Sequence, residues 1–312
     1  MRDVAKIAAL NEQHGIYGAA RVETGKGGLP KVSIETKLCR AEVYLYGAQV
    51  TSWKPAGFDE ILFVSEKSNW ESGKAIRGGI PVCFPWFRAK PDDPKAPMHG
   101  FVRTKVWEVG GIQQEPDGSV RVLLSTGSDE ESRRWWPYEF QLEYVLRIGK
   151  MLELELRMHN LGRSDLQFQE ALHTYFHVGD VTKASVRGLD GVRFLDNRDD
   201  NKEKLQQGDV VLRKWTDNAY LNATGAVEVL DPVLGRRLLT EKSGSVSTIV
   251  WNPWSDGAAK LTDFGADEWQ GMLCVEGGNV LGQAVSLQRE GTHKMSVSIR
   301  AVGIEGNRTN MR

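Results

Sequence analysis

The stretch EFQLEYVLRIGKMLELELRMH, residues 139–159, decides the fold class. Apolar and polar residues alternate over 140–147, and they alternate again over 152–159. A period of two is typical of a half-buried strand. Gly149 and Lys150 interrupt the pattern and supply a short glycine turn. The stretch therefore predicts two antiparallel strands joined as a hairpin.

The same alternation recurs along most of the chain. It predicts further strands at 31–36, 41–46, 49–53, 120–125, 245–251 and 294–299. Helical patterns are short and fall at 3–13, 129–134 and 266–269. No alternation of strands with helices appears, which argues against a parallel nucleotide-binding sheet. We expect an all-β protein: one large antiparallel β-sandwich curved around a cleft, spanning 30–312, after an N-terminal extension at 1–29 that holds a short helix.

Composition narrows the classes of function. The 312 residues are 40% hydrophobic, enough for a large core, and the net charge of −1 shows no basic excess for nucleic acid. No stretch is long and apolar enough for a membrane span or a signal peptide. Three separated cysteines predict a reducing, cytoplasmic setting. Ten tryptophans and 33 glycines favour a β protein that binds a sugar, although most tryptophans fill cores.

Two stretches carry groups suited to proton transfer. The first, FQEALHTYFHVGDV at 168–181, places His173 and His177 in an aromatic run, and the second, MLCVEGGNV at 272–280, places Glu276 after an apolar run. A histidine and a carboxylate at strand ends are the minimum set for acid–base chemistry.

His173 and His177 also have the i, i+4 spacing of a helical zinc site. The chain lacks the Glu of an H-E-x-x-H motif, and the local period of two indicates a strand instead. On a strand His173, Tyr175 and His177 share one face. A metal site is thus the weaker alternative, and His177 is also readily explained as a structural histidine.

Two other stretches offer cations on stiff loops. AIRGGIPVCFPWFR at 75–88 places Arg77 before two glycines, and MHGFVR at 98–103 supplies His99 and Arg103. Glycines let the backbone approach a ligand, and a guanidinium binds an anion with two donors. The pair would suit a phosphate ester, with His99 expected beside it, whereas ordinary surface arginines are the alternative. Asp217, in WTDNAYL, predicts nothing by itself.

Five ordered motifs give the chain a specific resemblance over about residues 30–302: AIRGGIPVCFPWF, PMHGFVR, ALHTYF, WNPW and MLCVEGGNV. Together they resemble the hexose-6-phosphate mutarotases (glucose-6-phosphate 1-epimerases) of the aldose 1-epimerase superfamily. The resemblance implies a galactose-mutarotase-like sandwich, a monomer without cofactor, and interconversion of the α and β anomers of a hexose 6-phosphate.

The resemblance also assigns residues. The family's catalytic histidine and glutamate fall on His173 and Glu276, and its substrate-binding arginines fall on Arg77 and Arg103. Its substrate aspartate falls on Asp217, in a looser motif. The chain departs from the family pattern at two positions, with Met98 where the family often has glutamine and Arg88 where it commonly has glycine.

Mutarotation needs a base at the anomeric O1 and an acid at the ring O5. We expect Glu276 as base and protonated His173 as acid, with burial raising the pKa of the glutamate and a neighbouring carboxylate or acceptor sustaining the imidazolium. Asp217 would hold sugar hydroxyls, and Arg77 and Arg103 would fix the phosphate. The competing readings are an epimerase of unphosphorylated aldoses and a carbohydrate-binding sandwich without catalysis.

Overall fold

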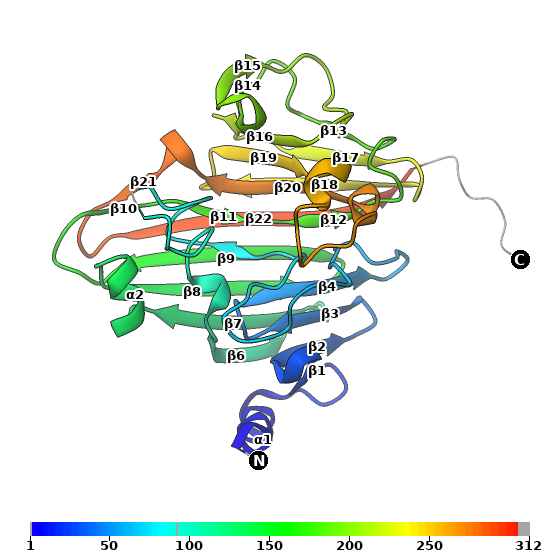
Figure 1. The fold of residues 1–312 in the computed structure, drawn as a ribbon. Coiled ribbons are helices and arrows are strands. Elements are labelled where there is room, and N and C mark those ends of the chain that lie inside the picture. The colour runs from blue at the N-terminus through cyan, green and yellow to red at the C-terminus, as the bar shows by residue number, and fades with distance from the viewer. Residues whose placement is uncertain (1, 92, 305–312) are drawn as a thin grey trace, which may run out of the picture.

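The computed structural model describes residues 2–91 and 93–304, and these form a β-sandwich (Figure 1). All pairings between its named strands are antiparallel within the described residues, as the sequence predicts. Three sheets, numbered 1 to 3 below, and a two-stranded ladder of β10 (Leu166–Phe168) and β21 (Val285–Leu287) make up the fold.

Sheet 1 has the order β1-β2-β3-β4. Its strands are β1 (Ala20–Thr24), β2 (Pro30–Glu35), β3 (Cys39–Tyr44) and β4 (Gln49–Pro55). Sheet 2 has the order β15-β14-β16-β19-β20-β11-β5, and β12 also pairs with β20. Its strands are β5 (Val82–Cys83), β11 (Glu170–Leu172), β12 (Tyr175–His177), β14 (Arg193–Asp196), β15 (Lys202–Leu205), β16 (Thr216–Leu221), β19 (Ser247–Asn252) and β20 (Met272–Asn279).

Sheet 3 has the order β13-β17-β18-β22-β9-β8-β7-β6. Its strands are β6 (Glu108–Gln114), β7 (Val120–Gly127), β8 (Phe140–Ile148), β9 (Met151–Asn160), β13 (Ser185–Arg187), β17 (Val227–Asp231), β18 (Arg236–Ser243) and β22 (Thr292–Gly303). Its β8–β9 hairpin confirms the hairpin prediction, and Gly149 N–H donates to Met151 O across the turn.

Helices are short and peripheral. The α-helices are α1 (Arg2–His14), α2 (Glu130–Trp135) and α3 (Trp254–Ala258). Single 3₁₀ turns are η1 (Lys26–Gly28), η2 (Val102–Thr104), η3 (Asn197–Asp199), η4 (Glu268–Gly271) and η5 (Leu281–Gln283). Within the described residues, no helix combines the length and apolar character that crossing a bilayer requires.

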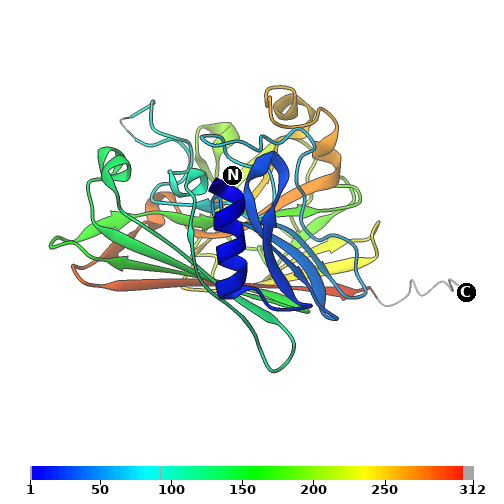
Figure 2. The same cartoon turned by 90° about the horizontal axis from the view of Figure 1, so that it is seen from below.

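Helix α1 lies against the edge of sheet 1, as Figure 2 shows. The Asn11 side chain accepts a hydrogen bond of 2.7 Å from Val22 N–H and donates to Val22 O. Strand β1 pairs along its whole length with β2. Residues 20–24 of the expected extension are therefore part of sheet 1.

Strand β20 shows how the sandwich presents a working face. Leu273 and Val275 enter the main core, which sheet 3 shares. Cys274 and Glu276 alternate with them and therefore point to the opposite face of sheet 2. The three cysteines of the chain are free and buried, two of them on sheet 2 and Cys39 on sheet 1. One face of β20 thus stabilises the fold, and the other is available for chemistry.

Candidate active site

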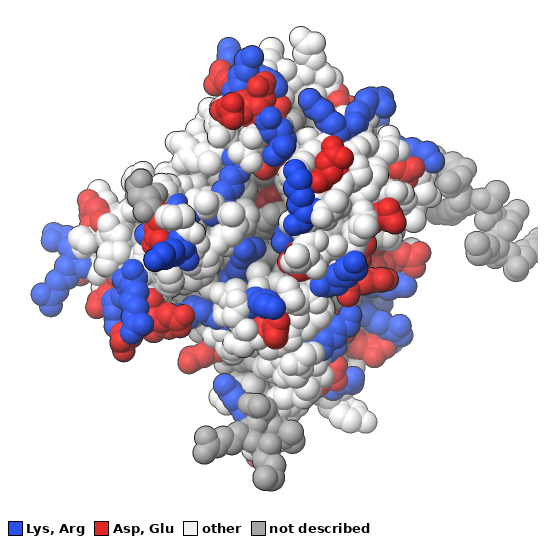
Figure 3. Space-filling model, in the orientation of Figure 1, with Lys and Arg blue, Asp and Glu red and all other residues white. Residues whose placement is uncertain are grey.

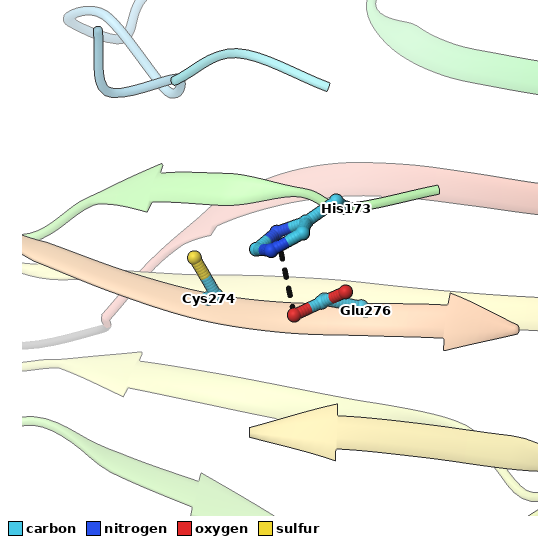
Figure 4. Close-up of side chains that lie close together, drawn as sticks. All are labelled: His173, Cys274 and Glu276. Carbon is cyan, nitrogen blue, oxygen red and sulfur yellow. Dashed lines mark ion pairs between the residues drawn. The ribbon is translucent and has the colours of Figure 1, made fainter. Parts of the chain in front are cut away.

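The two predicted acid–base residues meet on that outer face of sheet 2 (Figure 4). His173 lies between β11 and β12, where its N–H donates to Pro81 O, and Glu276 lies on β20. His173 Nδ1 is 3.3 Å from Glu276 Oε1, and the side chains are only 8% and 1% exposed. Among the described residues, His173 Nδ1 and Glu276 Oε2 have no hydrogen-bond partner. Buried polar atoms left free in this way commonly mark a functional site.

Both members of this pair lie where charge is disfavoured. Burial raises the pKa of Glu276 well above its ordinary value, and the Asp217 carboxylate adds to the rise. Burial lowers the pKa of His173 well below its ordinary value, and the positive charges of Arg103 and Arg77 lower it further. The favoured form of the free site is therefore a protonated carboxyl beside a neutral imidazole.

The raised pKa of Glu276 agrees with the expectation from the sequence, whereas the lowered pKa of His173 differs from the expected imidazolium. The expected carboxylate that would sustain the imidazolium is absent from the described surroundings of His173, whose ion-pair partner is Glu276 itself. Transfer of one proton across the 3.3 Å contact interconverts the neutral and the ionised pair. The pair thus holds the single proton that an acid–base exchange needs, and its surroundings decide where that proton rests.

Aromatic rings fix the orientation of His173. The ring of Tyr175 stacks on it at 4.7 Å with an interplanar angle of 13°, and Trp251 meets it edge-on at 6.1 Å. Tyr175 opposes Cys274 across β12 and β20, so the strand register places its ring beside His173 and Glu276. The imidazole is therefore held by packing, while its Nδ1 stays free of other partners.

His99 lies next to His173, as expected for a residue of the same site. The two rings meet edge-on at 5.5 Å. His99 Nδ1 accepts a hydrogen bond of 3.1 Å from the Arg88 N–H. Burial, helped by Arg103, lowers the pKa of His99 well below its ordinary value. The ring is therefore neutral with its proton on Nε2, which makes it a hydrogen-bond donor.

Arg77 is held rigidly on the Tyr175 side of the pair. Its Nε and Nη2 donate to the Asp263 carboxylate at 3.2 and 3.1 Å, and its Nη1 donates to Tyr175 Oη at 3.2 Å. The following Gly78 has φ 120°, and a Cβ there would lie 2.4 Å from Phe63 O. Glycine is therefore required for the chain to bring Arg77 into this position.

Arg103 differs from Arg77 because its charge is not neutralised. Its guanidinium makes no hydrogen bond or ion pair with any residue in the described ranges. Burial lowers the pKa of Arg103, and the nearby charge of Arg77 lowers it as well. Gly100 sets the loop in place: it has φ 76°, and a Cβ there would lie 1.8 Å from Phe84 O. A largely buried cation without a partner is well suited to bind an anion.

Asp217 lies on β16, on the other side of the pair. Arg88 Nη2 donates to Asp217 Oδ1 at 2.6 Å, and Asn197 Nδ2 donates to Oδ2 at 2.6 Å. Arg88 Nη1 reaches Asn201 Oδ1 at 3.0 Å. Arg88, one of the two departures from the family pattern, thus links Asp217 to the 197–201 turn instead of pointing to solvent. Met98, the other departure, is 49% exposed.

Potential metal ligands form one group in the described part of the chain. His173, Cys274 and Glu276 each place a ligand atom within 4.8 Å of the others, and His177 is not among them (Figure 4). Burial raises the pKa of the Cys274 thiol well above its ordinary value, so the thiol is protonated near neutral pH. The zinc pair suggested by the histidine spacing is therefore not the group that the fold brings together.

Sequence reasoning missed several residues of the site. Asp263, Asn197 and Cys274 contact or adjoin the predicted residues. Asp263 and Asn197 lie in segments without a distinctive pattern, whereas Cys274 lies in the MLCVEGGNV motif, two residues before Glu276 and so on the same face of the strand. Tyr175 was detectable, because the period of two places it on the same face as His173. Figure 3 shows that this face of the molecule is hollowed near its centre, with Lys and Arg atoms beside the hollow.

Comparisons with known proteins identify the family of the chain. The family model described as aldose 1-epimerase matches residues 30–300. A relative from Escherichia coli K12 is 34% identical over 80% of this chain and 82% of its own length, and one from Cenchrus ciliaris is 35% identical over 80% and 78%. Both are provisionally named glucose-6-phosphate 1-epimerase.

A solved structure gives the same result for the fold. A provisionally named mutarotase from Salmonella typhimurium superposes with a TM-score of 0.86 at 28% identity, covering 96% of this chain and 99% of its own. The predicted galactose-mutarotase-like sandwich is confirmed. The chain belongs to the aldose 1-epimerase family of isomerases.

Proposed function

We propose that this protein interconverts the α and β anomers of hexose 6-phosphates, with D-glucose 6-phosphate as its principal substrate. The observation that carries the proposal is Arg103, a largely buried guanidinium without a partner in the described residues, near the paired His173 and Glu276. A 6-phosphate would supply the missing anion. The names of the Escherichia coli and Cenchrus ciliaris relatives support the same substrate.

The two ends of the site fit the two ends of the reacting group. In a hexose 6-phosphate the ring O5 lies on the phosphate side of the anomeric carbon, and O1 lies on the far side. His173 experiences the charges of Arg103 and Arg77, whereas Glu276 experiences those of Asp217 and Arg88. This division favours His173 as the group facing O5 and Glu276 as the group facing O1.

Ring opening then begins with transfer of the shared proton from Glu276 to His173. Glu276 removes the O1 proton while His173 donates its proton to O5, and the C1–O5 bond breaks. The open-chain aldehyde forms, and the pair returns to its neutral form. No metal or redox cofactor takes part in these steps.

Ring closure runs the same steps in reverse. After rotation about C1–C2, neutral His173 accepts the O5 proton and protonated Glu276 donates to the carbonyl oxygen. The bond forms on the other face of the carbonyl and gives the other anomer. Asp217 and His99 would bind sugar hydroxyls meanwhile, and Arg77 and Arg103 would keep the phosphate in place.

Magnetisation-transfer NMR between the α and β anomers tests the proposal directly. Enzyme is added to glucose 6-phosphate and, in parallel, to free glucose and free galactose. Fast exchange with the phosphate ester and slow exchange with the free sugars is the expected result. Fast exchange with the free sugars instead would make the protein an epimerase of unphosphorylated aldoses and would refute the phosphate role of Arg103.

A further inference from the structure

Building on the proposed function, we propose that the substrate phosphate activates the catalytic pair as well as anchoring the sugar. An anion held by Arg103 and Arg77 favours the protonated form of His173, which is the form that can donate a proton to O5. The arginine site would then determine how fast a bound sugar reacts, in addition to which sugar binds.

A short structural path connects the arginines with the histidine. Arg77 Nη1 donates to Tyr175 Oη at 3.2 Å, and the Tyr175 ring stacks on His173 at 4.7 Å. A single aromatic ring thus separates the guanidinium from the imidazole. The Asp263 carboxylate accepts hydrogen bonds from the other two nitrogens of Arg77, so the positive charge of Arg77 is already offset. Arg103 supplies the positive charge that has no anionic partner in the described residues.

The charges of the two arginines change the pKa of His173. The pKa of His173 is lowered by burial and then by Arg103 and Arg77, so an empty arginine site opposes the imidazolium. A phosphate dianion beside the same arginines would reverse that effect, because the interaction of charges is strong in a poorly solvated site. Among the described residues, the titratable groups that lie beside His173 include His99, Tyr175, Cys274 and Glu276.

Anchoring and activation predict different kinetics. Contacts that bind substrate and transition state equally lower KM and leave kcat unchanged. An anion that promotes proton transfer from Glu276 to His173 stabilises the charges of the transition state and raises kcat. A sugar without phosphate should therefore react slowly even when it saturates the site, and a separate anion should restore part of the rate.

The test divides the substrate into two pieces. D-Xylose keeps the reacting ring but lacks the carbon that carries the phosphate, which leaves room for inorganic phosphite in the arginine site. Anomer exchange of saturating D-xylose is measured by magnetisation transfer with increasing phosphite, at an ionic strength kept constant with NaCl. We expect phosphite to raise the enzymatic rate about 10-fold, the change that one pKa unit represents.

Two further measurements separate the outcomes. Exchange of glucose 6-phosphate is measured on the same sample, and its absence would reject the proposed function itself. Competition by phosphite against glucose 6-phosphate reports whether the anion occupies the site. Phosphite that competes without speeding D-xylose exchange would show that the phosphate only anchors, and it would overturn the activation proposal. Phosphite that neither competes nor activates would overturn it too.

Variants locate the effect. Arg103→Ala should abolish phosphite activation, whereas Arg163→Ala, which removes an exposed arginine elsewhere, should leave it unchanged. Tyr175→Phe keeps the stacked ring but loses the hydroxyl that contacts Arg77, and it should reduce the activation without abolishing D-xylose exchange. Full activation in Arg103→Ala would contradict the proposal.

Discussion

Two histidine–glutamate pairs in the described residues have a fully buried glutamate, and they are built differently. In the first, His293 Nε2 lies 2.6 Å from Glu170 Oε1, and the same oxygen accepts a hydrogen bond of 2.8 Å from Asn279 Nδ2. In the second, His173 and Glu276 are 3.3 Å apart. The first pair is short and reinforced. Each pair leaves Oε2 of its glutamate without a partner in the described residues, but the second pair is longer and leaves His173 Nδ1 free as well.

Position explains the difference. Glu170 is on β11 of sheet 2 and His293 is on β22 of sheet 3, so their contact connects the two layers of the sandwich. His173 and Glu276 both belong to sheet 2 and project from its outer face. Identical residue types thus hold the fold together on one face and are positioned for proton transfer on the other. Groups kept unsatisfied for function generally cost stability.

The largest expected effect comes from removing the proton exchange of the outer pair. Glu276→Gln keeps the side-chain volume but cannot accept the O1 proton, and anomer exchange of glucose 6-phosphate should fall about 100-fold or more. His173→Ala should cause a similar loss. The free energy of unfolding of Glu276→Gln, measured with urea, should change by less than about 1 kcal/mol. Near-normal exchange in either variant would contradict the catalytic assignment.

The matched change in the inner pair, His293 and Glu170, should lower stability and leave activity nearly unchanged. Glu170→Gln removes a charge-assisted contact between the sheets, and the free energy of unfolding should decrease by about 1–3 kcal/mol. Exchange per folded molecule should stay close to that of the unaltered enzyme. If this variant loses activity as Glu276→Gln does while remaining folded, the division between a structural and a catalytic pair is wrong.

Asp217→Asn tests the charges around the outer pair. The Asp217 carboxylate helps burial to raise the pKa of Glu276, so its removal lets the shared proton leave at lower pH. The alkaline limb of the kcat/KM profile should move to lower pH. KM for glucose 6-phosphate should also rise, because a group expected to bind sugar hydroxyls is lost. A shift to higher pH would reverse the proposed sign.

Arg88→Gly should give the smallest effect and a shift of opposite sign. Arg88 has φ 62°, a conformation that costs a side-chain residue about 1 kcal/mol and glycine almost nothing. This relief should offset the lost contact with Asp217 and leave the stability nearly unchanged. Arg88 lowers the pKa of Glu276, so its removal should move the alkaline limb slightly upward. If the alkaline limb moved in the same direction in Asp217→Asn and Arg88→Gly, the opposing effects of these two residues on the pKa of Glu276 would be excluded.

The fold was predictable from the sequence because period-two alternation is local. Residues 139–159 show both strands and the turn directly. Motif order also pointed to His173, Glu276, Arg77 and Arg103, and the structure places the first two 3.3 Å apart.

Other features depend on distant segments and could not be read in this way. Nothing local distinguishes Glu170 from Glu276, since the side of sheet 2 to which each points depends on strand register. The local sequence does not reveal the role of Asp263 either, because its partner Arg77 is 186 residues away in the chain. The charge state of the pair depends on burial and on arginines from other loops.

The rate at which each of the three buried cysteines is alkylated can report how often the surrounding part of the protein opens. Burial raises the pKa of the Cys39, Cys83 and Cys274 thiols, so the folded chain offers alkylating reagents almost no thiolate. Each thiol is modified only during moments when its surroundings separate. The alkylation rate of Cys39 would report the opening of sheet 1, and that of Cys274 would report the opening of the strand that carries Glu276. Mass spectrometry of partly alkylated samples could therefore compare how often the scaffold and the catalytic strand open.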